Sequence, residues 1–354
     1  MREEKRLVGI DLLRNLSMFG IVLLHMTGAS GIITSATPGT TNYYCAWFVE
    51  AIVFCSVNVF GLISGYVGVE GKWKISNYMY LWLEVEFYNV LIYFFARLIH
   101  PEWIDGYELK ELFFPVSSNL YWYFSAYFMV FAFMPIINAA FETLNKGSLT
   151  IILILMFIMY SIIPLIIGDT FYAGFGYSGS WLVFLYYFGG YIRRFSEIEK
   201  KSALFLLGYI IITLLAFCIY IMRNYVSENY VSNLLNGLFK YNSPVVLAQA
   251  IFLIYAFKSL NLNSILRRIT ISIAPLSFAV YLIHGHKILF WALIVEKWNY
   301  FASCSIYKQL LVSGGMSILI FVSCILIDWI RYRIFEILRV RTILKKLDVY
   351  VKKM

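Results

Sequence analysis

The feature that most constrains this chain is a series of ten long apolar stretches, because a membrane-spanning helix needs about 20 mostly apolar residues. The stretches are expected at 9–28, 43–69, 78–99, 120–141, 149–168, 177–192, 203–222, 244–257, 269–295 and 310–330. Charged residues make up only 14% of the 354 residues, whereas soluble domains carry about 25%. The strict alternation of a membrane β-barrel is absent. The sequence therefore predicts an all-α polytopic bundle of about ten transmembrane helices, which satisfy their backbone hydrogen bonds internally.

The positive charges predict how this bundle is oriented. With ten crossings both termini lie on one side, and most of the 29 lysines and arginines fall in segments on that side. Because cytoplasmic loops are enriched in Lys and Arg, we expect both termini in the cytoplasm and a multi-pass protein of the cell membrane. The net charge of +9 then needs no nucleic-acid partner. We expect residues 1–330 to form one membrane domain. The basic segment 331–354 is expected to lie as an amphipathic helix on anionic lipid headgroups, with a solvated tail as the alternative.

Ionisable side chains inside the apolar stretches are the first candidates for function, because each costs roughly 2.5–3.5 kcal/mol on insertion scales. The first stretch carries Asp11, Arg14 and His25. At 100° per residue, Arg14 and His25 project within about 20° of each other and lie about 16 Å apart along the helix. Asp11 precedes Arg14 by three residues, a spacing that allows them to pair. Interfacial anchors and a structural histidine are the alternatives, but the shared face favours a functional stripe.

The ninth stretch holds a second polar cluster. Ser277, Tyr281 and His284 follow each other at helical spacing and share a face of the helix. An ordinary belt of Tyr and His at the membrane interface explains the same residues equally well.

Three glutamates also fall within apolar stretches. Glu84 and Glu86 are two residues apart and point to different sides of their helix, so they form no carboxylate pair with each other. Either of them is a candidate partner for the polar stripe of the first stretch. Glu50, in the second stretch, stands alone.

Five short motifs resemble those of acyltransferase family 3, the integral-membrane acyltransferases that modify cell-surface sugars. They are Arg14 followed by ten residues and His25, the segment 60–66 (FGLISGY), the segment 120–124 (LYWYF), the segment 176–191, and the segment 277–284 (SFAVYLIH). The fourth is similar to the exopolysaccharide O-acetyltransferase branch. Many members carry R-x-x-R near the start of the third span, and the corresponding residues 77–80 here read NYMY.

The resemblance implies an acetyltransferase that uses acetyl-CoA as its donor and a carbohydrate as its acceptor, with no metal. It implies Arg14 and His25 as the catalytic pair, His25 acting either as general base or as the group that accepts the acetyl. The donor phosphates would be bound by cations, namely Arg14, Lys72, Lys74, Arg267 and Arg268. The acceptor side would involve Asp11, Ser64, Glu84, Tyr281 and His284. The acceptor's identity, the acyl chain, O- versus N-transfer and the oligomeric state stay open at this point.

A transporter or flippase for a cell-envelope precursor is the competing interpretation, since many spans and intramembrane charges fit that class as well. No repeated half is visible in the sequence, and a transporter would not need Arg14 and His25 in phase at different depths. A membrane scaffold in a polysaccharide assembly complex is a weaker third possibility.

Overall fold

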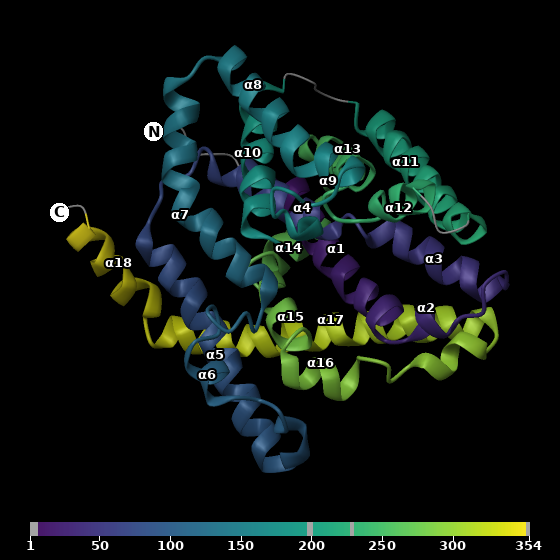
Figure 1. Ribbon diagram of the computed structural model, residues 1–354. Coiled ribbons are helices and arrows are strands. Elements are labelled where there is room, and N and C mark those ends of the chain that lie inside the picture. Colours follow the sequence, from purple (N-terminus) through teal and green to yellow (C-terminus); the bar gives the residue numbers. More distant parts are fainter. Residues whose placement is uncertain (1–5, 197–200, 227–229, 352–354) are drawn as a thin grey trace.

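The protein is described here by a computed structural model that covers residues 6–196, 201–226 and 230–351, and every regular element in these ranges is helical (Figure 1). The α-helices are α1 (Val8–Leu24), α2 (Ile32–Ser35), α3 (Thr41–Val53), α4 (Ser56–Gly68), α5 (Ile75–Ile99), α6 (Leu109–Phe113), α7 (Trp122–Thr143), α8 (Lys146–Phe157), α9 (Ile163–Ile166), α10 (Gly179–Phe195), α11 (Ser202–Met222), α12 (Tyr230–Gly237), α13 (Pro244–Lys258), α14 (Ser264–Ile273), α15 (Ser277–His284), α16 (Lys287–Leu293), α17 (Ile306–Ile337) and α18 (Val340–Val351). Short π or 3₁₀ turns are η1 (His25–Ala29), η2 (Pro101–Ile104), η3 (Ile158–Ile162), η4 (Gly174–Gly176), η5 (Arg223–Tyr225) and η6 (Asn299–Ser303).

Six helical segments in the described ranges are long and apolar enough to cross a membrane. They are Val8–Ser35, Thr41–Gly68, Trp122–Thr143, Lys146–Ile166, Ser202–Met222 and Ile306–Ile337. The pair α14 and α15, bent by 47°, makes a seventh if it is counted as one span. The other three expected stretches correspond to α5, which has 25 residues but carries two glutamates, and to α10 and α13, which have only 17 and 15 residues. The all-helical fold is confirmed, six or seven helices of the described ranges are clear candidate spans, and the count of about ten and the side of the termini stay predictions.

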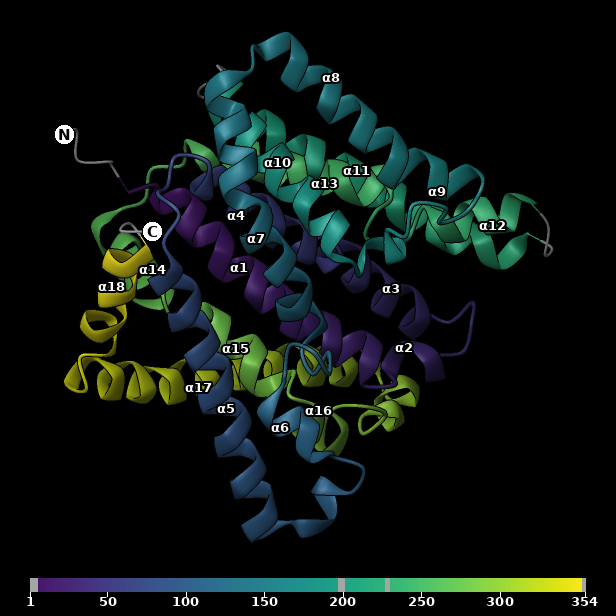
Figure 2. The ribbon, with the colours of Figure 1, turned by 60° about the vertical axis from the view of Figure 1, so that its left-hand side comes forward.

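Helix α1 lies in the middle of the bundle (Figures 1 and 2). It packs against α3, α4, α13, α14, α15 and α17. Its buried residues include the apolar Leu13 and Val22 but also the polar Asn15, whose amide donates to the carbonyl of Thr270 in α14 at 3.2 Å. Because neighbours surround α1, its polar side chains face protein rather than lipid.

Helices α4 and α10 pack closely because glycines line their contact. A Cβ on Gly65 of α4 would overlap the backbone of Tyr186 in α10, and a Cβ on Gly189 of α10 would overlap the carbonyl oxygen of Leu62 in α4. Small residues allow membrane helices to approach each other in this way. The Ser64–Gly65 motif is therefore explained in part by packing, since Gly65 is the residue that admits α10.

A buried ion cluster joins α5 to α17. Arg331 donates to both carboxylate oxygens of Asp328, at 2.7 and 2.8 Å, and to Glu84 of α5 at 3.2 Å. The hydroxyls of Tyr88 and Tyr80 complete the cluster, one bonded to Asp328 at 2.7 Å and the other to Arg331 at 3.0 Å. The Arg331 side chain is 1% exposed and that of Asp328 is 0% exposed. A buried ion pair of this kind persists only when further hydrogen bonds satisfy its members.

The chain ends in the amphipathic helix α18, which packs on the start of α5. Asp348 accepts hydrogen bonds from the backbone N–H and the hydroxyl of Ser76, at 3.0 and 2.6 Å. The last span was expected to end at residue 330, but α17 continues to Ile337, so Arg331 belongs to the bundle rather than to the tail. Residues 352–354 of the expected tail lie outside the described residues. The start of α1 and helix α18 lie on the same side of the bundle in Figure 2.

Candidate active site

Arg14 lies on α1 beside an acidic residue one turn earlier. Its Nη1 donates to Asp11 Oδ1 at 3.1 Å, and Asp11 Oδ2 accepts from Arg6 Nε at 2.6 Å. The Asp11 and Arg14 side chains are 11% and 25% exposed, respectively. Among the residues that the structure describes, Arg14 uses one of its five N–H donors in this pairing, so the other four remain for a bound anion.

His25 meets His284 from a distant part of the chain. His25 begins the π-helical turn η1 that continues α1, and His284 is the last residue of α15. His25 Nδ1 and His284 Nε2 are 3.0 Å apart. The His284 Nδ1 is hydrogen-bonded to the carbonyl oxygen of Val280, one turn earlier in the same helix.

These two bonds together assign the tautomers of both rings. A carbonyl oxygen accepts hydrogen bonds and never donates them, so the His284 Nδ1 carries a proton, and in the neutral ring its Nε2 is an acceptor. The His25 Nδ1 must then be the donor in the bond between the rings. This leaves the lone pair of the His25 Nε2 free, which is the form that a base or a nucleophile requires.

His25 lines a cavity of about 620 Å³, a volume typical of sites for small molecules. Ten of the 23 residues in its wall are aromatic: Phe54, Phe60, Trp122, Tyr123, Tyr177, Tyr241, Phe278, Tyr281, Phe290 and Trp291. The charged residues in its wall are Glu50, Glu111 and Lys287, and the last two form an ion pair at 2.7 Å. We call this space the outer cavity.

Arg14 lines two basic cavities as well as the small one described in the next paragraph. One, of about 330 Å³, includes Lys72, Lys74, Ser64 and Tyr127 in its wall. The second, of about 380 Å³, combines Arg14 with Arg6, Asp11 and Arg193. The two cavities therefore gather five cations around the first helix: Arg6, Arg14, Lys72, Lys74 and Arg193. Planar guanidinium groups and lysine ammonium groups in such a cluster suit phosphate.

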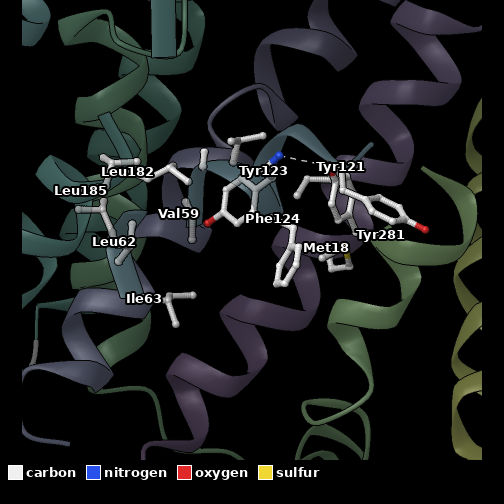
Figure 3. Packing of buried hydrophobic residues seen from close by; sticks show 14 of the residues in the cluster. Met18, Val59, Leu62, Ile63, Tyr121, Tyr123, Phe124, Leu182, Leu185 and Tyr281 are labelled. Atoms are coloured by element: carbon white, nitrogen blue, oxygen red, sulfur yellow. Dashed lines mark hydrogen bonds between the residues drawn. The ribbon is translucent and has the colours of Figure 1, made fainter. Parts of the chain in front are cut away.

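A smaller cavity of about 210 Å³, here called the neck, lies between the basic side and the outer cavity. It shares Arg14, Ser64, Leu81 and Tyr127 with the first basic cavity, and Phe60, Tyr123 and Phe278 with the outer cavity. Figure 3 shows Tyr123 of α7 and Tyr281 of α15 meeting beside Met18, where the Tyr123 N–H donates to the Tyr281 hydroxyl at 3.4 Å. The three cavities form a series that begins at Arg14 and ends at His25.

The remaining sequence candidates lie in different places. The Ser64 hydroxyl donates to the Phe60 carbonyl at 3.0 Å within its own helix, at the border of the neck. Glu84 does not meet Arg14 or His25, because it pairs with Arg331 in the cluster between α5 and α17. Arg267 lines a separate cavity, and Arg268 is exposed and lines none of the cavities described here.

Three residues of the cavities had no role in the sequence analysis. Glu50 was visible as an ionisable residue in an apolar stretch, but spacing showed no partner for it. Arg193 was counted only as a charge at the end of a span, although it lines a basic cavity together with Arg14. Tyr123 lies within the motif at 120–124, but the sequence assigned it no role of its own.

A family model described as an acyltransferase domain, that of acyltransferase family 3, matches residues 7–329. The chain belongs to this family. As a member of acyltransferase family 3 the protein is a membrane acyltransferase, which sets aside the transporter interpretation. No curated protein and no solved structure matches the chain. The matched range contains the His25–His284 pair, and assignment to the exopolysaccharide O-acetyltransferase branch stays a prediction.

Proposed function

We propose that this acyltransferase moves an acetyl group from acetyl-CoA to a hydroxyl of a cell-surface or lipid-linked sugar. The observation that supports this proposal best is the series of cavities from the basic cluster at Arg14 to the free Nε2 of His25. A polyanionic donor with a long, thin arm and a thioester at its tip has the matching shape and charge. Its phosphates bind at one end of the series while its acetyl group reaches the other.

The cations divide into two groups in this proposal. Arg14, Lys72 and Lys74 surround the cavity that opens into the neck, so they bind the donor phosphates that precede the pantetheine arm. Arg267 and Arg268 lie away from that cavity and contribute at most long-range attraction. We expect this basic side to face the cytoplasm, where acetyl-CoA is found.

His25 acts as the general base. Its Nε2 takes the proton of the acceptor hydroxyl, and the acceptor oxygen attacks the thioester carbonyl carbon. The tetrahedral intermediate collapses as the carbon–sulfur bond breaks, and the imidazolium returns its proton to the thiolate. The products are the acetyl ester and the free thiol of CoA, and His25 ends in its starting form.

Tyr281 and His284 support this chemistry from α15. The Tyr281 oxygen accepts the Tyr123 N–H, and in the described part of the chain its own hydroxyl proton has no acceptor, so it can donate to the oxyanion. The His284 Nε2 holds the His25 ring in the reactive tautomer and stabilises the imidazolium that forms. Asp11 acts indirectly, by holding Arg14 in place.

The experiment that tests the proposal is acetyl transfer by purified protein in nanodiscs. The protein receives labelled acetyl-CoA and crude surface glycan, and label in the glycan is measured. We expect transfer by the wild type, none by His25→Ala, and full transfer by His100→Ala, a matched control in an exposed loop outside the cavities. Transfer by His25→Ala at the wild-type rate would rule out its role, and no transfer by folded wild type would rule out the function.

A further inference from the structure

Glu50 of α3 is a buried acidic residue held on the same turn that carries His25. Its side chain lies at the helix interface, and the residue is 7% exposed. Its Oε2 accepts a hydrogen bond from the Thr27 hydroxyl at 2.6 Å, and Thr27 follows His25 by two residues in η1. The position of this carboxyl group relative to the His25 ring is therefore set by one short element.

The second oxygen of Glu50 is available to the outer cavity. Among the described residues no donor is bonded to Oε1, and Glu50 is part of the cavity wall. Gly28 leaves room for this oxygen, because a Cβ at position 28 would lie 3.2 Å from Oε1. A carboxyl oxygen that has no protein donor and borders a cavity takes its hydrogen bond from whatever fills that cavity, and a bond to a charged group contributes about 1.5–3 kcal/mol.

No cation in the cavity wall meets this need. Lys287 is the one lysine or arginine among the described residues of the wall, and it is bonded to Glu111 at 2.7 Å and to the carbonyl of Gly106 at 3.1 Å. The free oxygen of Glu50 is therefore available to bond with the ligand that enters the cavity.

Another part of the same wall is shaped for a flat, ring-shaped ligand. Trp122, Tyr177 and Tyr241 cluster there, with ring centroids of Trp122 and Tyr177 4.6 Å apart and those of Tyr177 and Tyr241 5.0 Å apart. Aromatic faces beside a few fixed polar groups are typical of sites that orient a ligand by stacking and by hydrogen bonds.

From this juxtaposition we propose that the outer cavity is the acceptor site and that Glu50 orients the acceptor. Its Oε1 accepts a hydrogen bond from a second hydroxyl or amino group next to the hydroxyl that His25 deprotonates. The acceptor is accordingly a sugar unit with adjacent donor groups, stacked on the aromatic cluster. This inference rests on the proposed function and makes Glu50 a positioning residue, distinct from the base.

The test compares Glu50→Ala and Glu50→Gln with wild type in nanodiscs, using crude surface glycan and acetyl-CoA as the two substrates. We expect Glu50→Ala to raise the apparent KM for glycan about tenfold or more, because a hydrogen bond to a charged group is lost. The Glu50→Gln variant keeps an acceptor oxygen and should lose less. The KM for acetyl-CoA should be unchanged in both.

Two further variants keep the test decisive. Glu86→Gln makes the same change in a half-buried glutamate of α5 outside the cavities described here, and its glycan KM should equal that of wild type. Gly28→Ala crowds Oε1 without removing it and should also raise the glycan KM. Binding of acetyl-CoA, measured by equilibrium dialysis, shows that each variant is folded.

The outcomes separate this inference from the proposed function. If wild type transfers acetyl groups and both Glu50 variants and Gly28→Ala keep the wild-type glycan KM, Glu50 does not position the acceptor although the enzyme is an acetyltransferase. If the Glu50 variants raise both KM values equally, the residue is structural and the inference is overturned. If folded wild type transfers nothing, the proposed function fails first.

Discussion

Replacement of His284 tests the hydrogen-bond assignment on which the proposed mechanism depends. In the ground state His25 Nδ1 donates to His284 Nε2 over 3.0 Å. When His25 takes the acceptor proton it becomes an imidazolium, and the same bond becomes a bond from a charged donor. A neutral hydrogen bond contributes about 1 kcal/mol and one to a charged group about 1.5–3 kcal/mol. The bond therefore stabilises the transition state more than the ground state.

The difference between the charged and the neutral bond is about 0.5–2 kcal/mol, which at 1.4 kcal/mol per factor of ten corresponds to a rate decrease of roughly 2- to 30-fold. We expect His284→Ala to lower kcat by this factor with an unchanged KM for acetyl-CoA. The partner of the His284 Nδ1 is a carbonyl, not a carboxylate, so the effect should stay below the factor of about 10⁴ seen when the aspartate of a serine-protease triad loses its charge.

The assay is acetyl transfer to glycan at saturating acetyl-CoA, compared among His284→Ala, His284→Gln and wild type. The glutamine oxygen can accept from His25 Nδ1, so His284→Gln should recover most of the lost rate. A kcat for His284→Ala equal to that of wild type would refute the orienting role. Equal losses in the two variants would refute the assignment of His284 as acceptor.

Three other predictions follow from single contacts. Arg14→Ala should raise the KM for acetyl-CoA at least tenfold. The KM for S-acetyl-N-acetylcysteamine, a thioester without phosphates, should not change. Equal effects on the two thioesters would contradict phosphate binding by Arg14. Arg331→Met should destabilise the protein by about 3–5 kcal/mol, because it leaves Asp328 and Glu84 buried without a cation. The melting temperature in nanodiscs measures this loss, and a value equal to that of wild type would count against the ion cluster. Asp348→Ala should release α18 from α5 at a cost of about 1 kcal/mol, measured as faster proteolysis of the C-terminal segment; an unchanged cleavage rate would show that this contact does not hold the helix.

The relation between Arg14 and His25 was predictable because it depends on one regular helix. Helix α1 is α-helical from Val8 to Leu24, and the π turn begins only at His25. The period of 3.6 residues therefore holds over the whole interval between the two side chains. Both residues line cavities of the same series, as a shared face would produce.

Contacts between distant helices were not predictable in the same way. His25 and His284 are separated by 259 positions, and spacing relates only residues of one helix. The partner of Glu84 was missed for a specific reason: Arg331 lay one residue beyond the expected end of the last span and was counted as a charge of the tail. The helix continues seven residues past that point, and this places the guanidinium inside the bundle.

The arrangement of Arg331 also bears on how the last span enters the bilayer. Arg331 and Asp328 stand one turn apart in α17, so the bond between them forms as soon as that turn is helical. Helix α17 thus contains the counterion of its own arginine, so a neutral ion pair and not an unpaired guanidinium is inserted into the bilayer. Glu84 pairs with Arg331 from a different helix, so it gains this counterion only once α17 has packed against α5, and the docking of these two helices is therefore a late step of assembly.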